Sequence, residues 1–398
     1  MVAASVSEWM SCHSLTLAAT PEMKKLRENW HRDGLIKGCG ACPEDFHSSL
    51  SVCFRCAHPV AMTALNRTIR WGVLGYARIA RESVIPAILR SGNSEFYALA
   101  SHDEAKLAES RTRFPSGHRL YPNYEELLDD PAVDAVYVPL PNSLHREWTI
   151  RAAELGKHVL CEKPIALNAA ECREMMAACA AHRVTLMEAF MYRYTDRTRQ
   201  VLDVVRSGVL GEIKFVESSF RYLLANPASI KLKPELGGGA LYDVGCYPIN
   251  FAGLVADVAA GAPAGTVRPE SVAVECVRAG GIDLLFSALL KYPSGLVAAL
   301  HCGFNAHKRI GSEIIGTQGM LEIPDTFFDN AGALVLTTGE THREIPVALS
   351  DRYRFEVEDF ADAILQQRPP QFGLAETLRN AETLDRLLVR AGGQTRAA

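Results

Sequence analysis

From Thr68 onward the chain alternates short apolar segments with helix-like segments at a regular spacing. Five segments have the length and composition of buried strands. They cover residues 69–75, 95–100, 135–140, 158–162 and 185–190. Helical patterns such as those at residues 143–155 and 168–182 lie between them. Apolar strands that alternate with helices predict a doubly wound α/β domain, in which helices cover both faces of a parallel sheet.

The pattern changes after about Phe190. A helix near residues 196–207 leads to a run of longer strands, and two helices near residues 354–366 and 375–390 follow them. The strands are expected at residues 212–222, 271–279, 282–292, 296–304, 312–323 and 333–339. Long strands in succession predict a mostly antiparallel sheet, and therefore a second domain of the α+β class.

Composition is that of an ordinary soluble protein. The chain has 398 residues, which favours two domains, and 48% of them are hydrophobic and 22% charged. A net charge of −4 gives no reason to expect nucleic-acid binding. No apolar run is long enough to span a membrane, and the first residues lack the order of a signal peptide. We therefore expect a cytoplasmic protein with reduced cysteines and no nucleic-acid or membrane partner.

The segment that precedes the alternating pattern differs from the rest. We expect residues 1–61 to be a poorly ordered extension, residues 62–190 to be the first domain and residues 191–398 the second. The extension holds two CxxC pairs, a spacing typical of structural zinc sites. The pairs are formed by Cys39, Cys42, Cys53 and Cys56. Because the extension has no clear apolar periodicity, an unstructured segment is the preferred interpretation, and no metal site is assigned.

Residues 72–80 read GVLGYARIA and have the form of a dinucleotide-binding turn between a strand and a helix. The fingerprint G-x-G-x-x-G/A maps onto Gly75, Ala77 and Ala80. Gly75 allows the tight turn and Ala80 allows close packing of helix on strand, whereas Ala77 replaces the usual second glycine. A generic strand-to-helix turn is the alternative. The residues expected at the cofactor are Gly75, Ala77, Arg78, Ile79 and Ala80.

The end of the second strand bears on the choice between NAD and NADP. A carboxylate there accepts a hydrogen bond from the ribose 2′-hydroxyl. This chain has Ser101 and His102 at that point, with Asp103 one position late and with Arg78 and Lys106 as added positive charge. We predict that NADP is the cofactor, and NAD stays open because Asp103 could reach the ribose.

The strand at residues 135–140 ends in an irregular loop that contains two prolines. Leu140, Asn142 and His145 are expected to line the nicotinamide side of the cofactor crevice. In the alternative interpretation, Ser143 caps the following helix and His145 faces solvent. The sequence does not decide between the two.

Residues 157–164 read KHVLCEKP, a short buried strand that ends in Glu162, Lys163 and Pro164. Open α/β sheets bind ligands at the carboxyl ends of their strands. Charged residues at this point therefore predict a functional site.

Residues 237–250 read GGGALYDVGCYPIN. Three glycines allow a close approach of backbones. Asp243 and Tyr247 are four positions apart, so on a helix they share one face. Lys231 and Lys233 precede the glycines, and the sequence leaves open whether they contact substrate or solvent.

Together these motifs resemble the glucose–fructose oxidoreductase, inositol dehydrogenase and MocA (Gfo/Idh/MocA) family. The matching stretches run in order from about Thr68 to Arg390: GVLGYARIA, VYVPLPNSLH, GKHVLCEKP, LMEAFMYRY and GGGALYDVGCYP. The last is most similar to the branch with dimeric dihydrodiol dehydrogenase and NADP-dependent xylose dehydrogenase. The resemblance implies a Rossmann domain followed by an α+β domain with a large open sheet, which binds substrate and forms a dimer or tetramer.

The resemblance also implies that Lys163, Asp243 and Tyr247 are catalytic, although many relatives carry His where Tyr247 stands. Tyrosine is a poor base at its reference pKa of about 10, and we expect Lys163 and the oxidised nicotinamide to lower that pKa. Tyr247 then exchanges the proton, Lys163 stabilises charge and Asp243 orients Lys163 or a substrate hydroxyl. Reversed roles, with Lys163 as the base, remain open. Glu162 and Arg193 are expected beside the cofactor.

The expected function is hydride transfer between NAD(P) and a carbinol carbon of a sugar, polyol or vicinal diol. One alternative is a ketoreductase of nucleotide-activated sugars, which needs a basic cluster for the pyrophosphate. A second is a catalytically silent nucleotide-binding sensor, which loss of Lys163, Asp243 or Tyr247 would favour. A third is a zinc-dependent interaction protein built on the extension.

Overall fold

The computed structural model describes residues 67–392. The predicted extension and its four cysteines lie outside these residues. Within them, no group of His, Cys, Asp and Glu side chains is arranged to hold a metal ion. No helix among the described residues has the length and apolar character that crossing a membrane requires.

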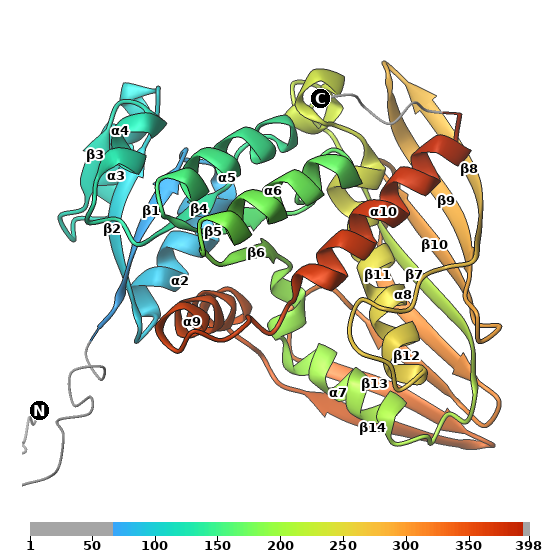
Figure 1. Cartoon of the computed structure of the whole chain (residues 1–398). Coiled ribbons are helices and arrows are strands. Elements are labelled where there is room, and N and C mark those ends of the chain that lie inside the picture. The colour runs from blue at the N-terminus through green and yellow to red at the C-terminus, as the bar shows by residue number, and fades with distance from the viewer. Residues whose placement is uncertain (1–66, 393–398) are drawn as a thin grey trace, which may run out of the picture. The chain divides into compact units, whose positions relative to one another are not determined.

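The first sheet has six strands in the order β3-β2-β1-β4-β5-β6 (Figure 1). All neighbouring strands run parallel. The strands are β1 (Ile69–Leu74), β2 (Ser94–Ala100), β3 (Arg119–Tyr121), β4 (Ala135–Val138), β5 (His158–Glu162) and β6 (Leu186–Ala189). The predicted parallel sheet is confirmed, and only the three-residue β3, which is largely polar, was not foreseen. The strand order reverses between β1 and β4, where such sheets form their ligand crevice.

Helices cover both faces of this sheet. In Figure 1, α5 and α6 lie on one face, and α2 and α9 lie on the other. The helices of this part are α2 (Ile85–Arg90), α3 (Glu104–Arg113), α4 (Tyr124–Asp129), α5 (His145–Glu154) and α6 (Ala169–Ala181). Side chains of Asp103, Asn123 and Asn168 accept hydrogen bonds from backbone N–H groups at the starts of α3, α4 and α6. Helix capping by Asp and Asn therefore sets where these helices begin.

The second sheet has eight strands in the order β14-β13-β12-β11-β7-β10-β9-β8. They are β7 (Ile213–Leu223), β8 (Ser271–Ala279), β9 (Ile282–Lys291), β10 (Val297–Gly303), β11 (Asn305–Gly316), β12 (Met320–Pro324), β13 (Gly332–Thr338) and β14 (Thr341–Val347). Only β7 and β10 pair in parallel, so the prediction of a mostly antiparallel sheet is confirmed. The single strand predicted at residues 312–323 is wrong, because Gly316 and Gly319 hydrogen bond across a turn that separates β11 from β12. The polar, exposed β14 was not predicted.

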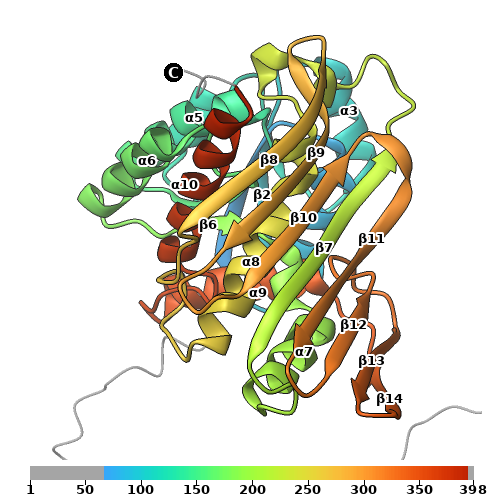
Figure 2. The same ribbon diagram turned by 90° about the vertical axis from the view of Figure 1, so that its right-hand side faces the viewer.

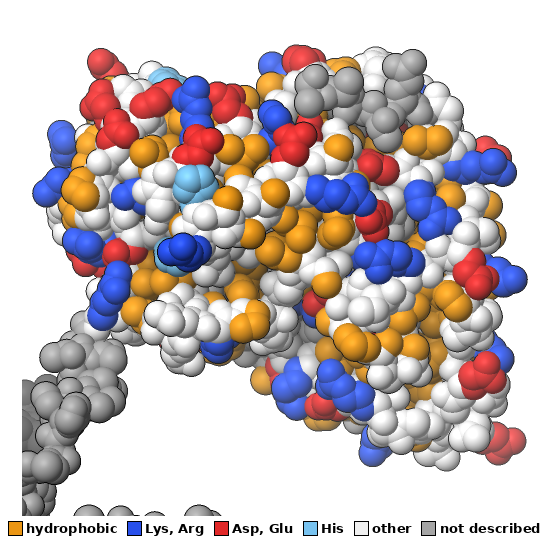
Figure 3. All heavy atoms as spheres, viewed as in Figure 1, with side chains coloured by type: hydrophobic (Ala, Val, Ile, Leu, Met, Phe, Trp, Pro, Cys, Tyr) orange, Lys and Arg blue, Asp and Glu red, His pale blue; other side chains and the backbone are white. Residues whose placement is uncertain are grey.

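Helix α8 (Cys246–Ala259) packs behind the second sheet, whose outer face is turned toward the viewer in Figure 2. Nearly all of its residues are buried, which explains why its sequence shows no polar face. The other helices of this part are α7 (Asp196–Arg206), α9 (Arg352–Leu365) and α10 (Leu374–Arg390). On the face shown in Figure 3, acidic and basic side chains are interspersed over the surface.

Strand β6 carries a buried carboxylate, Glu188, whose side chain belongs to the core that supports the end of β5. Glu188 is 2% exposed, and its Oε1 accepts a hydrogen bond of 2.9 Å from the backbone N–H of Ile165. Burial raises the pKa of Glu188 to about 8. The folded protein therefore holds this proton at pH values where the unfolded chain has released it.

We predict that Glu188 makes stability fall as the pH rises. Its contribution is present below the unfolded pKa and is lost as the pH rises through the folded pKa of about 8. Glu188→Gln should remove this dependence and be more stable than the parent at about pH 8.5, by up to a few kcal/mol, but not at about pH 4.5. Thermal unfolding of both proteins and of the exposed control Glu174→Gln tests this. An equal pH dependence of stability in Glu188→Gln and the parent would contradict it.

Candidate active site

Lys163 follows the carboxyl end of β5 and meets two residues that lie far along the chain. Its ammonium donates a hydrogen bond of 2.7 Å to the backbone oxygen of Asp243 and lies 3.5 Å from Asp243 Oδ1. It also lies 4.9 Å from the centroid of the Tyr247 ring. The side chains of Lys163 and Asp243 are 13% and 17% exposed. The structure thus brings together all three residues that were expected to be catalytic.

One helical stretch carries both Asp243 and Tyr247. Asp243 lies in a π-helical turn, η7 (Leu241–Gly245), which runs directly into α8, where Tyr247 is the second residue. Turns of this kind are frequent at functional sites. The predicted shared orientation is found, since both side chains reach Lys163.

The three glycines that precede this helix each pack against a different partner. A Cβ on Gly237 would lie 2.7 Å from Asn142 Cβ, and a Cβ on Gly238 would lie 2.5 Å from the backbone oxygen of Lys231. A Cβ on Gly239 would lie 2.5 Å from Asp283 Oδ1. The predicted close approach of backbones therefore occurs at Gly238, and the glycines hold the loop that contains Lys231 against the helix start.

Asp243 has two further partners that the sequence did not identify. Lys231 Nζ lies 2.7 Å from Asp243 Oδ2 and donates to the Tyr222 hydroxyl at 2.9 Å. Tyr222, on β7, donates to the same carboxylate oxygen at 3.2 Å. Lys233 is exposed and forms no ion pair with any described residue. The sequence spacing between Tyr222 and Asp243 does not indicate that the two residues are neighbours, because only the packing of β7 against η7 brings them together.

The electrostatics of the site favour protonated Lys163 and ionised Asp243. Burial alone would lower the pKa of Lys163, but Tyr247 and Asp243 outweigh burial and raise it well above its ordinary value. Burial alone would raise the pKa of Asp243, but Lys163 and Lys231 hold it below its ordinary value. At neutral pH the site therefore contains two ammonium groups around one carboxylate.

The pKa of Tyr247 corrects our expectation. Burial raises it well above its ordinary value, although Lys163 acts in the opposite direction. Tyr247 is 5% exposed, and its ring lies 5.3–5.5 Å from the rings of Phe190, Phe220 and Phe327. The predicted lowering of this pKa is therefore wrong for the protein alone, because the apolar enclosure outweighs the nearby cation. Tyr247 holds its proton at neutral pH.

Glu162 lies beside Lys163 and is half-buried. Its Oε1 accepts a hydrogen bond of 2.6 Å from the Tyr137 hydroxyl on β4, and its Oε2 accepts one of 3.3 Å from the backbone N–H of Lys163. Burial raises the pKa of Glu162, with Lys163 and Tyr137 partly offsetting this. The peptide bond between Lys163 and Pro164 is cis.

The turn after β1 has the geometry that a dinucleotide requires. Gly75 has a φ of +94°, and a Cβ there would meet Leu140 Cδ2 at 3.1 Å and the Tyr124 hydroxyl at 3.4 Å. Gly75 also donates to the backbone oxygen of Ala100 at 2.8 Å. Only glycine fits this turn without strain. Leu140, which was expected near the nicotinamide, lies against the Gly75 turn.

The next residues of this turn are partly open to solvent. Ala80 is fully buried where the helix packs on β1, as the fingerprint requires. Ala77 and Ile79 are partly exposed, and Arg78 is exposed and has no ion pair with a described residue. A free guanidinium at a glycine turn suits a phosphate group. These residues therefore fit a dinucleotide.

The end of β2 presents no free carboxylate. Ser101 is 5% exposed, and its hydroxyl accepts from the backbone N–H of Asp103 at 3.2 Å. Asp103 caps α3 by accepting from the N–H groups of Ala105 and Lys106 at 3.0 and 3.3 Å. His102 is exposed at the same corner. Because Asp103 is engaged in capping, its carboxylate is directed toward α3.

His145 differs from both of its expected positions. It is fully buried, with Nδ1 3.0 Å from the backbone oxygen of Pro164 and Nε2 2.9 Å from that of Leu140. It therefore ties together the loops after β4 and β5, and it neither lines the crevice nor faces solvent. Asn142 donates to the backbone oxygen of Gly237 at 3.0 Å, which joins the loop after β4 to the glycines. Within the described residues, no side chain caps α5.

Arg193 also requires a correction. It is 7% exposed, and its Nη1 lies 2.6 Å from Glu376 Oε2 on α10. The guanidinium is enclosed in this ion pair and is not open to a cofactor in this arrangement. A buried arginine needs such a partner, and its sequence position gave no indication of one.

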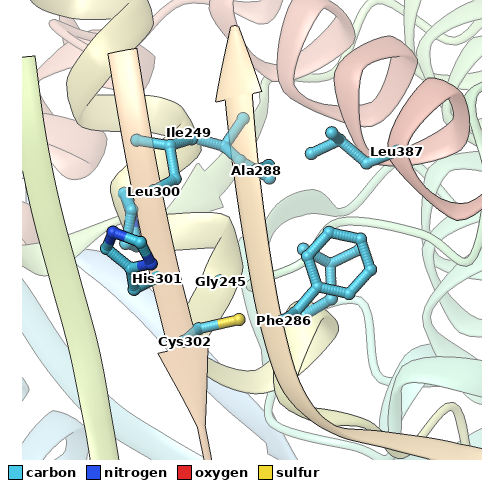
Figure 4. A pocket seen from close by; sticks show the side chains of 10 residues that line it. Gly245, Ile249, Phe286, Ala288, Leu300, His301, Cys302 and Leu387 are labelled. Carbon is cyan, nitrogen blue, oxygen red and sulfur yellow. The ribbon is translucent and has the colours of Figure 1, made fainter. Parts of the chain in front are cut away.

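An apolar cavity lies where η7 and α8 pack against strands β9 and β10. Its volume is about 10 Å³, room for at most one water molecule. Figure 4 shows side chains of Ile249, Phe286, Leu300 and Leu387 around it. The cavity is a packing defect between α8 and strands β9 and β10, and it is too small for a substrate.

The combination of a glycine turn at the switch point of a parallel sheet and a Lys–Asp–Tyr cluster defines a nicotinamide-dependent oxidoreductase. Residues 69–190 match the model of an oxidoreductase family with an NAD-binding Rossmann fold. Residues 198–322 match the GFO/IDH/MocA C-terminal domain. The chain belongs to the GFO/IDH/MocA family, so the predicted family, fold class and cofactor class are confirmed.

Several relatives match most of the chain. The D-xylose 1-dehydrogenase (NADP+) 2 of Haloferax volcanii is 36% identical, over 79% of this chain and 95% of the relative. The trans-1,2-dihydrobenzene-1,2-diol dehydrogenase of Xenopus laevis is 28% identical, over 81% and 98%. A crystal structure of a 3-ketoreductase from Actinomadura kijaniata in complex with NADP and TDP-benzene superposes with a TM-score of 0.75 at 30% identity, and covers 82% of this chain and 98% of that one.

Proposed function

We propose that this oxidoreductase transfers hydride between NADP and a carbinol carbon of a sugar, polyol or vicinal diol. The observation that carries the proposal is the meeting of Lys163, Asp243 and Tyr247 at the carboxyl edge of the parallel sheet. Named relatives act on a pentose and on a vicinal diol. These two substrates share a hydroxyl-bearing carbon with a hydroxyl on the neighbouring carbon.

The chain's own residues handle the proton and the charge. Bound nicotinamide supplies the hydride donor or acceptor. The Lys163 ammonium, which donates one N–H to the backbone oxygen of Asp243, stabilises negative charge on the reacting oxygen. Tyr247 holds its proton at neutral pH, so it donates that proton to the oxygen when a carbonyl is reduced. Oxidation of the alcohol requires the same group to accept a proton, so its rate should rise toward alkaline pH.

Lys163→Ala should abolish turnover while the fold survives. We expect kcat to fall at least about 100-fold, the usual contribution of a positioned acid–base group. The assay screens D-xylose, other aldoses, polyols and a trans-dihydrodiol with NADP, and binding of NADPH shows that the fold is intact. Lys233→Ala, an exposed lysine two residues from Lys231, is the matched control. Near-normal turnover by Lys163→Ala would contradict the catalytic assignment.

We propose NADP over NAD because the end of β2 offers Ser101 and no free carboxylate, while Asp103 caps α3. The carboxylate of Asp103 is turned toward α3 and lies 3.8 Å from the Lys106 ammonium, so its charge is partly compensated, and Arg78 is exposed on the glycine turn. The H. volcanii relative is NADP-dependent and the A. kijaniata structure contains NADP, which supports the same choice.

Ser101→Asp should shift the preference from NADPH to NADH. The new carboxylate would repel the 2′-phosphate and accept from the 2′-hydroxyl, so we expect Kd for NADPH to rise by at least about tenfold. Quenching of tryptophan fluorescence, titrated with NADPH and with NADH, measures both constants. Ser101→Asn has the same shape without the charge and should keep the NADPH preference. An unchanged preference in Ser101→Asp would exclude Ser101 from cofactor selection.

A groove beside the site favours reduction of a nucleotide-activated ketosugar as a second candidate. It has a volume of about 550 Å³ and is lined by Tyr222, Leu223, Asn305, Ala306, His307 and Lys308. Tyr222 contacts Asp243, so the groove adjoins the catalytic cluster, and Lys308 could pair with a pyrophosphate. The substrate screen described above, together with a binding measurement, separates the sugar or diol dehydrogenase from the ketoreductase. Binding of thymidine diphosphate that weakens in Lys308→Met, with no turnover of free sugars, would favour the ketoreductase.

We also propose that two copies pack through the outer face of the second sheet. Val277 and Leu289 are 51% and 49% exposed on β8 and β9, and exposed apolar groups often mark interaction surfaces. Sedimentation velocity should show a dimer or tetramer that Leu289→Glu dissociates. A monomeric parent protein would contradict the proposal.

We propose a cytoplasmic location for the protein. The six cysteines among the described residues are free thiols, which supports a reducing, cytoplasmic location. We propose an extension (1–61), a Rossmann domain (62–190) and a substrate domain (191–398). The family matches, which cover residues 69–190 and 198–322, support the boundary near residue 191, although α9 of the last segment packs on the first sheet.

A further inference from the structure

Lys231 reaches the site from a loop whose backbone is held in place. It lies in a short 3-10 helix, η5 (Ile230–Leu232), and its backbone oxygen accepts a hydrogen bond of 2.9 Å from Gly239 N–H. The backbone oxygen of Lys233 accepts one of 2.9 Å from Gly238 N–H. Because a Cβ on Gly238 would lie 2.5 Å from the Lys231 oxygen, the glycine permits this close packing. The position of Lys231 is therefore part of the fold.

The two oxygens of the Asp243 carboxylate have different partners. Oδ1 lies 3.5 Å from Lys163 Nζ, whereas Oδ2 lies 2.7 Å from Lys231 Nζ and accepts from Tyr222 at 3.2 Å. Lys231 is thus the nearer cation and hydrogen bonds to Oδ2, while the more buried Lys163 exerts the larger Coulombic attraction on the carboxylate without a short contact to either oxygen. The Lys231 side chain is 34% exposed, and the carboxylate is 17% exposed.

Because Lys231 and Tyr222 bind Oδ2 of Asp243, Lys163 keeps N–H groups that are free to bind a reacting oxygen. An ammonium has three N–H donors. One donates to the backbone oxygen of Asp243 at 2.7 Å. The distance of 3.5 Å to Oδ1 is longer than the 2.7–2.9 Å or so of a charge-assisted hydrogen bond. Lys163 is therefore held in place without being fully engaged by the carboxylate.

We propose that Lys231 is a positioning residue for proton transfer: it binds Oδ2 of Asp243, so that Lys163 keeps an N–H for the reacting oxygen. Lys231 acts through Asp243 and does not itself contact the reacting atoms. The inference rests on the proposed function, because it assigns a task to Lys163 in that reaction.

The charged and titratable groups around Asp243 determine how loss of Lys231 changes the pKa of the proton-exchanging group. Six charged or titratable groups face Asp243 from the elements packed around it. They are Glu162 on β5, Lys163 directly after β5, Lys231 on η5, Tyr222 on β7, Cys246 on α8 and Cys302 on β10. Tyr247 on α8 faces Lys163. Arg78 adds a cation near Tyr222. Removing Lys231 takes positive charge from this cluster and raises the pKa of the proton-exchanging group, whether that group is Tyr247 or Lys163.

The test compares Lys231→Met, which keeps side-chain length without charge, with Lys231→Arg, which keeps the charge. The assay is oxidation of D-xylose by NADP at a series of pH values. We expect Lys231→Met to lower kcat about tenfold with KM within about twofold, and to move the alkaline rise in rate about one pH unit upward. Lys231→Arg should keep the parent pH profile, and Lys233→Met is the matched control on the same loop.

Other outcomes would overturn the proposal. A change in KM alone would make Lys231 a substrate contact. A lower thermal stability with an unchanged pH profile would make its role purely structural. Equal losses in Lys231→Met and Lys233→Met would show that the effect is not specific to the contact with Asp243.

A second measurement does not depend on turnover. Trace acetylation with acetic anhydride labels amines in proportion to their unprotonated fraction, and mass spectrometry reports the rate at Lys163. Loss of the Lys231 charge should slow this labelling about tenfold at a fixed pH, and Lys231→Arg should restore it. An unchanged rate would overturn the proposal. If D-xylose is not a substrate, the labelling still decides the role of Lys231. Failure of the proposed function can therefore be told apart from failure of the role proposed for Lys231.

Discussion

The contact between Lys163 and Asp243 is the constraint on which the rest of the site depends. Both side chains are largely buried, and a buried charge without its partner is strongly destabilising. Lys163 directly follows the carboxyl end of β5 in the parallel sheet. Asp243 lies in a helical turn packed against the second sheet. The charged pair therefore forms only when both parts of the chain are folded and in contact. This requirement places the Lys163–Asp243 pair at their junction.

The surroundings of this pair set the protonation states on which the chemistry depends. Tyr247 is enclosed by aromatic rings, so its hydroxyl stays protonated despite the ammonium over its ring. Asp243 stays ionised because two ammonium groups face it. The site thus holds a neutral proton donor beside a cation, an arrangement suited to reduction of a carbonyl at neutral pH and to oxidation of an alcohol at higher pH.

Hydrogen bonds to backbone groups hold the loops around Lys163 in place. The ring nitrogens of His145 lie 2.9–3.0 Å from the backbone oxygens of Leu140 and Pro164, and the neutral ring donates to one of them, in the loops after β4 and β5. Asn142 links the loop after β4 to Gly237. In sequence these residues resembled cofactor contacts, because polar side chains after a strand end are typical of both roles. Only burial and hydrogen-bond partners separate a ligand contact from a loop support.

The sequence by itself determined the alternation of strands and helices and the glycine turn at Gly75, because local periodicity and short motifs are encoded by neighbouring residues. It pointed to Lys163, Asp243 and Tyr247 through the resemblance of several motifs to one family. It could not separate β11 from β12, assign Arg193 to Glu376 or show that Tyr222 and Lys231 meet Asp243. Those features join segments that are distant along the chain. The tertiary structure also decided the pKa of Tyr247, since burial is a property of packing and not of sequence position.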